Sequence, residues 1–86
     1  MAASLPAITG QQLVRLFELD GWEPKRRTRE GIFFFKRGAD GRTRTTLITT
    51  KKTPLATGTL AHILGPLQSG VGRQGLEAMI ERHGLK

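Results

Sequence analysis

Four consecutive apolar residues, Ile32 to Phe35, lie between two strongly basic segments of this 86-residue chain. The run is too short for a core helix and favours a β-strand, because Phe and Ile suit a pleated, half-buried surface. Side chains alternate between the two faces of a strand, so Ile32 and Phe34 point one way. Phe33 and Phe35 point the other way. One pair has to pack beneath helices, whereas the other either faces outward, where it can stack on nucleic-acid bases, or lies beneath a second layer.

The segments around this run predict a three-stranded antiparallel meander over residues 22–50. Pro24 interrupts the basic segment before the run, which suits an edge strand better than a central one. Gly38-Ala39-Asp40-Gly41 follows the run, and its Asp-Gly pair is a strong hairpin signal. Residues 42–50 are rich in threonine and are predicted to form the returning strand.

Three helices are predicted around the meander. Thr9 and Gln12 have the spacing of a capping box, and a helix of about ten residues is expected to end at Gly21. Thr57 is expected to cap a short helix that Gly65 and Pro66 end. A third amphipathic helix is predicted from Arg73 to His83.

The order of elements predicts an α+β fold in one domain, since 86 residues are too few for two separate cores. Residues 1–7 are expected to be a loose lead-in, residues 8–86 the domain, and residues 65–86 a C-terminal helical extension. The chain contains no cysteine, which excludes disulfides and thiolate metal sites. No apolar stretch is long enough to span a bilayer and no signal peptide is recognisable, so a cytoplasmic protein without a membrane partner is expected.

Positive charge is concentrated in one part of the chain. The net charge is +7, but residues 25–52 alone carry +8 and the rest carries −1. Such asymmetry indicates a polyanionic partner, with RNA as the first candidate. The predicted RNA-binding residues are the ten basic residues of this segment: Lys25, Arg26, Arg27, Arg29, Lys36, Arg37, Arg42, Arg44, Lys51 and Lys52.

Residues with metal, cofactor or catalytic chemistry are few. The only histidines are His62 and His83, and neither has further ligands at metal-binding spacing, so no metal site is expected. His83 falls in the last turn of its predicted helix, where a positive charge suits the helix dipole. Residues 70–75 match G-x-G-x-x-G, but no strand precedes them, so a dinucleotide site is rejected. No small-molecule cofactor is expected.

Several motifs occur in an order that resembles a known family. A predicted helix ends in Leu19-Asp20-Gly21-Trp22, and a basic strand and a strand ending in Phe35-Lys36 follow. After the third strand comes Pro54-Leu55-Ala56-Thr57-Gly58-Thr59-Leu60, with Ile63-Leu64. Over residues 8–64 this pattern resembles the HicA toxins of toxin–antitoxin systems. The resemblance implies an α-β-β-β-α fold like that of double-stranded-RNA-binding domains, cleavage of mRNA, and a HicB-like antitoxin protein as partner.

The resemblance also implies a catalytic histidine at the start of the second strand, and this chain departs from it. That position falls on Glu30 or Ile32, depending on register, and no histidine occurs between residues 23 and 61. Imidazole suits RNA cleavage because it accepts and donates protons near neutral pH. The remaining candidates are Glu30 as general base and His62 as a group that has taken over the role. Whether ribonuclease activity is retained stays open.

Two functions from different classes therefore remain. The first is a HicA-like toxin that binds and cleaves mRNA through a basic sheet surface. The alternative is a non-catalytic module that binds RNA or docks an antitoxin on the same fold. DNA recognition by a helix is disfavoured, because the second helix carries no Lys or Arg.

Overall fold

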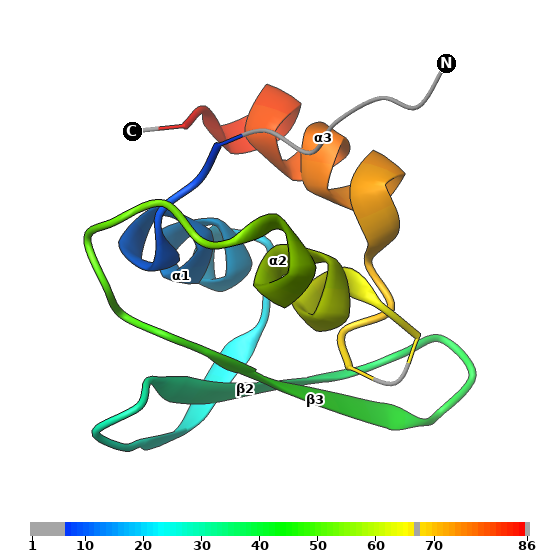
Figure 1. Cartoon of the computed structure of the whole chain (residues 1–86). Coiled ribbons are helices and arrows are strands. Elements are labelled where there is room, and N and C mark those ends of the chain that lie inside the picture. Colours follow the sequence, from blue (N-terminus) through cyan, green and yellow to red (C-terminus); the bar gives the residue numbers. More distant parts are fainter. Residues whose placement is uncertain (1–6, 67, 86) are drawn as a thin grey trace.

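The computed structural model describes residues 7–66 and 68–85. Within them the chain forms three helices and three strands in the predicted order (Figure 1). The elements are α1 (Gly10–Leu19), β1 (Glu23–Arg27), β2 (Ile32–Arg37), β3 (Thr43–Ile48), α2 (Thr57–Leu64) and α3 (Gly72–His83). The predicted α+β class is confirmed. The predicted lead-in, apart from Ala7, lies outside the described residues.

The three strands form one antiparallel sheet in the order β1-β2-β3, as the meander predicted. The β2–β3 pairing is regular, from Ile32 opposite Ile48 to Arg37 opposite Thr43. The β1–β2 pairing is interrupted by a bulge between Pro24 and Arg26. A proline and a bulge are typical of an edge strand, because both spoil the edge for further pairing.

All three helices lie on one side of the sheet, and no described helix covers the other side (Figure 1). α1 and α2 contact the strands, and α3 packs on α1 and α2. The side chains of β2 alternate accordingly. Ile32 and Phe34 are buried beneath the helices, whereas Phe33 and Phe35 are half-buried on the opposite side. Within the described part of the chain, no second layer therefore covers Phe33 and Phe35.

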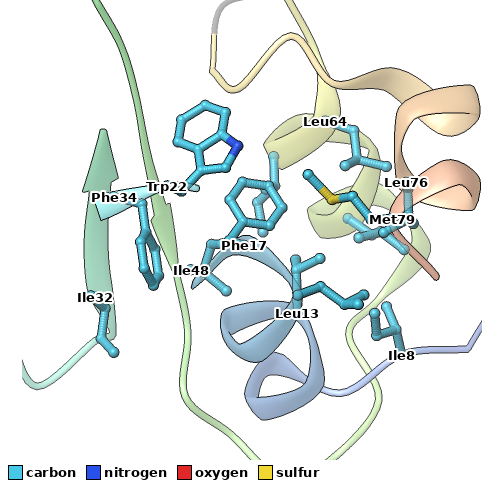
Figure 2. Close-up of a cluster of buried hydrophobic side chains, with 13 residues drawn as sticks. Ile8, Leu13, Phe17, Trp22, Ile32, Phe34, Ile48, Leu64, Leu76 and Met79 are labelled. Carbon is cyan, nitrogen blue, oxygen red and sulfur yellow. The ribbon is translucent and has the colours of Figure 1, made fainter. Parts of the chain in front are cut away.

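The core lies between the sheet and the helices (Figure 2). Phe17 of α1 is at its centre, with its ring centroid 5.0 Å from that of Trp22 and 6.1 Å from that of Phe34. Tilted aromatic pairs at these distances add about 0.5–1.5 kcal/mol each beyond the burial of their area. Leu76 and Met79 bring α3 into the same core. The C-terminal extension therefore completes the hydrophobic core of the domain.

The predicted N-terminal signal is confirmed at one of the two helices for which the sequence offered one. At α1 the Thr9 hydroxyl accepts the Gln12 N–H and the Gln12 side chain accepts the Thr9 N–H, which confirms the capping box. α3 ends at Gly84, which has a φ of 78°. At α2 the prediction was one position wrong. Thr57 is already the first residue of the helix, so Ala56 is the N-cap. Its methyl side chain cannot form a capping hydrogen bond. Among the described helices, none has the length and apolar character needed to cross a bilayer.

Candidate nucleic-acid interface

The helix-free side of the sheet, which we call the open face, is the most accessible aromatic surface of the described structure. Residues that pair directly in an antiparallel sheet point to the same side, so the partners of Phe33 and Phe35 can be assigned from the register. The open face carries Glu23 and Arg26 from β1, Phe33, Phe35 and Arg37 from β2, and Thr43, Thr45 and Leu47 from β3.

Arg26 and Phe33 form the centre of this face. The guanidinium carbon of Arg26 lies 5.1 Å from the centroid of the Phe33 ring, within the range of a cation–π interaction. The bulge before Arg26 shifts the register so that Arg26 pairs with Phe33. A hollow of about 400 Å³ opens beside the pair and is lined by Lys25, Arg26, Phe33 and Thr45. The site thus combines a ring that can stack on a base with cations that can contact phosphates.

The ten predicted RNA-binding residues do not share one surface. Three of them lie on or beside the open face: Lys25, Arg26 and Arg37. Lys36 lies two positions after Phe34 in β2, and Arg44 lies two positions before Thr46 in β3. Because alternate residues of a strand share a side, Lys36 and Arg44 point to the helix side of the sheet. Lys36 pairs there with Asp20, with Nζ 3.7 Å from Oδ2.

The remaining five basic residues lie outside the open face. Arg27 is exposed at the end of β1 and Arg29 in the turn to β2. Arg42 is exposed in the β2–β3 turn, where its N–H donates to Asp40 Oδ1. Lys51 and Lys52 are exposed between β3 and α2, and the Lys51 carbonyl accepts the Gln11 N–H. The structure thus brings two of the ten residues, Arg26 and Arg37, onto the open face and a third, Lys25, beside it.

The two candidate acid–base residues line one groove of about 520 Å³ at the free edge of β3. Glu30 comes from the turn before β2 and His62 from α2, and both residues are exposed. Thr46 also lines the groove. Its hydroxyl is buried and has no hydrogen-bond partner among the described residues. The groove brings two groups that can exchange protons onto one surface next to Phe33.

Asp20 organises this structure although no sequence motif marks it for that role. It contacts Lys36 of β2 and both Arg82 and His83 of α3. The position of Lys36 can be predicted, because it lies two residues after Phe34 and therefore on the same, helix-covered side of β2. No local pattern connects Asp20 with Arg82, which is 62 positions away along the chain.

Comparison with protein-family models, with curated proteins and with solved structures finds no match to this chain.

Proposed function

We propose that this protein binds single-stranded RNA through its open face, with Phe33 stacking on a base and Arg26, Lys25 and Arg37 contacting phosphates. The observation that carries the proposal is the Arg26–Phe33 pair, which lies on a side of the sheet that no described helix covers. Stacking on an aromatic ring tolerates any base, because every base has a π-face. A basic, aromatic sheet surface is therefore suited to strands of mixed sequence.

The family assignment is part of the same proposal. The helix, three antiparallel strands and second helix have the order expected of a HicA toxin with a double-stranded-RNA-binding-domain-like fold. The net charge of +7 suits both an RNA substrate and an acidic antitoxin of the HicB type. We propose a HicA-like protein that is held in check by such a partner.

Cleavage of the bound RNA is a second candidate function, supported by the groove that Glu30 and His62 share. In this mechanism the Glu30 carboxylate removes the proton of a ribose 2′-hydroxyl, whose oxygen attacks the adjacent phosphorus. The bond from phosphorus to the 5′-oxygen breaks, and protonated His62 gives that oxygen its proton. The products are a 2′,3′-cyclic phosphate and a new 5′-hydroxyl. This division of work is general acid–base catalysis by two groups that line the same groove.

Binding is tested by fluorescence anisotropy with a labelled single-stranded RNA. Arg26→Gln removes the cation over Phe33, and we expect it to weaken binding about tenfold. Arg73→Gln removes the same charge from α3, where Arg73 pairs with Glu77 at 3.5 Å, and serves as the matched control. Equal effects of the two variants would contradict the assignment of the open face.

Cleavage is tested separately with the same RNA on a denaturing gel. The proposal expects fragments ending in a cyclic phosphate, which Glu30→Gln and His62→Gln each abolish while leaving RNA binding intact. If the RNA stays intact after prolonged incubation with the native protein, the cleavage proposal fails and only RNA binding is retained.

A further inference from the structure

A further cavity, of about 240 Å³, lies on the helix side of the sheet. One wall is formed by Gly75, Met79 and Arg82 of α3 and by Val71, the N-cap residue of that helix. The opposite wall comes from the end of the sheet near the β2–β3 turn and includes Lys36 and Arg44. The cavity is separate from the open face, because both strand residues point to the covered side of the sheet.

Lys36 and Arg44 are direct cross-strand neighbours in the β2–β3 register. Like charges at directly opposite positions destabilise a sheet, because their side chains share one side at short range. Arg82 adds a third positive charge to the wall of the same cavity. The three cations are partly or fully exposed to solvent, and together they favour a negatively charged group in the cavity.

The protein supplies only part of that negative charge. Among the described residues, Asp20 is the one carboxylate that lines the cavity, and it is shared between two of the cations. Its Oδ2 lies 3.7 Å from Lys36 Nζ, and its Oδ1 lies 3.2 Å from an Arg82 nitrogen. Arg44 forms no ion pair with the described residues. The three cations and one carboxylate leave the cavity with an excess of two positive charges.

Arg44 is nevertheless held in place. One of its nitrogens donates to the Pro66 carbonyl at 3.4 Å. The loop beside it passes through Gly70, which has a φ of 68°. A Cβ at Gly70 would lie 3.1 Å from Arg44 Nη1, so a glycine lets the backbone approach the guanidinium closely. The loop therefore leaves the planar donor group of Arg44 beside the cavity with donors to spare.

We propose that this cavity binds a terminal phosphate group. A phosphate monoester carries about −1.5 to −2 charges at pH 7, which matches the excess of two, whereas a carboxylate or an internal phosphodiester carries only one. Guanidinium groups recognise phosphate oxygens through parallel N–H donors, and Lys36 adds a point charge. The G-x-G-x-x-G stretch lines this cavity through Gly70 and Gly75, but the volume suits a single phosphate with a small attached group.

The phosphate can come from two sources, the end of an RNA strand or a free phosphate in solution. Only the first source rests on the proposed RNA-binding function. In both cases the ligand chemistry is the same, and the experiment separates the sources.

The test is a titration of the ¹⁵N-labelled full chain with inorganic phosphate at constant ionic strength. We expect saturable shifts at the amides of Gly38, Ser69 and Gly70, with a Kd in about the millimolar range. Acetate, a monoanion, should bind distinctly more weakly. Arg44→Gln should weaken phosphate binding about tenfold or more. Arg42→Gln removes the same charge from the exposed β2–β3 turn, outside the cavity, and should leave phosphate binding unchanged.

The source is identified with two short RNAs that differ only in bearing a terminal phosphate or a terminal hydroxyl. Tighter binding of the phosphorylated strand, lost in Arg44→Gln, assigns the site to RNA ends. Saturable binding of inorganic phosphate with equal binding of the two strands assigns it to free phosphate. The absence of saturable shifts, or equal shifts in native protein and Arg44→Gln, would overturn the proposal. RNA binding through Arg26 is read from the hydroxyl-ended strand, so each of the two proposals can fail by itself.

Discussion

The guanidinium group of Arg26 lies over the ring of Phe33, 5.1 Å from its centroid, on the side of the sheet opposite the helices. Two features of β1 and β2 create this relationship. The bulge after Pro24 brings Arg26 opposite Phe33, and the alternation of β2 buries Phe34 while leaving Phe33 outward. The contact thus depends on the same register that fixes the core.

The first prediction concerns the Phe33 ring. Phe33→Leu keeps an apolar side chain on the open face but removes the aromatic plane. Because stacking contributes about 1–3 kcal/mol per base, RNA affinity should fall about 5- to 150-fold. Leu19 of α1 is exposed on the helical layer, so Leu19→Ala is the control and should bind as the native chain does. Fluorescence anisotropy measures both variants, and unchanged binding by Phe33→Leu would remove the ring from the interface.

The second prediction concerns salt. Three cations on or beside the open face, Lys25, Arg26 and Arg37, imply about three phosphate contacts. For a single strand the slope of log K against log salt is then about −2, so affinity should fall roughly 20-fold between about 50 and 200 mM salt. Arg26→Gln should make the slope shallower by about 0.7, whereas Arg73→Gln should leave it unchanged. A slope near zero would contradict phosphate contacts altogether.

Local sequence signals predicted the elements well, because each signal acts within a few residues. The Thr9–Gln12 capping box, the Asp40-Gly41 turn and the alternation through Ile32–Phe35 all have their expected structures. Alternation fixes which side chains share a face, but it does not say which face the helices cover. That choice comes from the packing of Phe17 against both Phe34 and Trp22, which no local pattern contains.

The candidate site was predicted less completely, because charge density along the chain is not charge density in space. Residues 25–52 include the two sides of a sheet, two turns and a loop, so their cations point in several directions. Lys36 and Arg44 are the clearest cases, because they alternate in step with Phe34 and Thr46 and therefore point to the helix side of the sheet. Alternation weighed together with charge would have separated Lys36 from Arg37 in β2. Arg26 reaches the open face only through the bulge after Pro24, which alternation does not predict.

The third prediction compares two glycines in helices. A Cβ at Gly10, the first residue of α1, would collide with the Thr49 carbonyl oxygen, whereas a Cβ at Gly58 of α2 would meet nothing within 4 Å. Gly10→Ala should therefore lower the free energy of unfolding by more than about 1 kcal/mol. Gly58→Ala should raise it by up to about 1 kcal/mol, since alanine favours the helix. Urea unfolding measures both, and changes of the same sign would contradict the described approach of α1 to residue 49.

The fourth prediction concerns the buried hydroxyl of Thr46, which has no hydrogen-bond partner among the described residues. Thr46→Val keeps the branched shape and removes the unpaired polar group. Because an unsatisfied buried hydroxyl costs about 1–3 kcal/mol, the variant should be more stable by about 1 kcal/mol or more. Thr45→Val, at the exposed neighbouring position, should change stability little. A lower urea midpoint for Thr46→Val would indicate that the hydroxyl is paired in solution.

The fifth prediction concerns Asp20, whose side chain is only 10% exposed and joins β2 to the end of α3. Asp20→Asn keeps the shape but removes the charge that faces Lys36 and Arg82. Both cations are partly exposed, so solvent offsets part of the loss, and we expect the free energy of unfolding to fall by about 1–2 kcal/mol. Glu77→Gln breaks the exposed pair with Arg73 and should cost less than about 0.5 kcal/mol. Urea unfolding of both variants checks the difference, and equal losses would mean that Asp20 acts as an ordinary surface carboxylate.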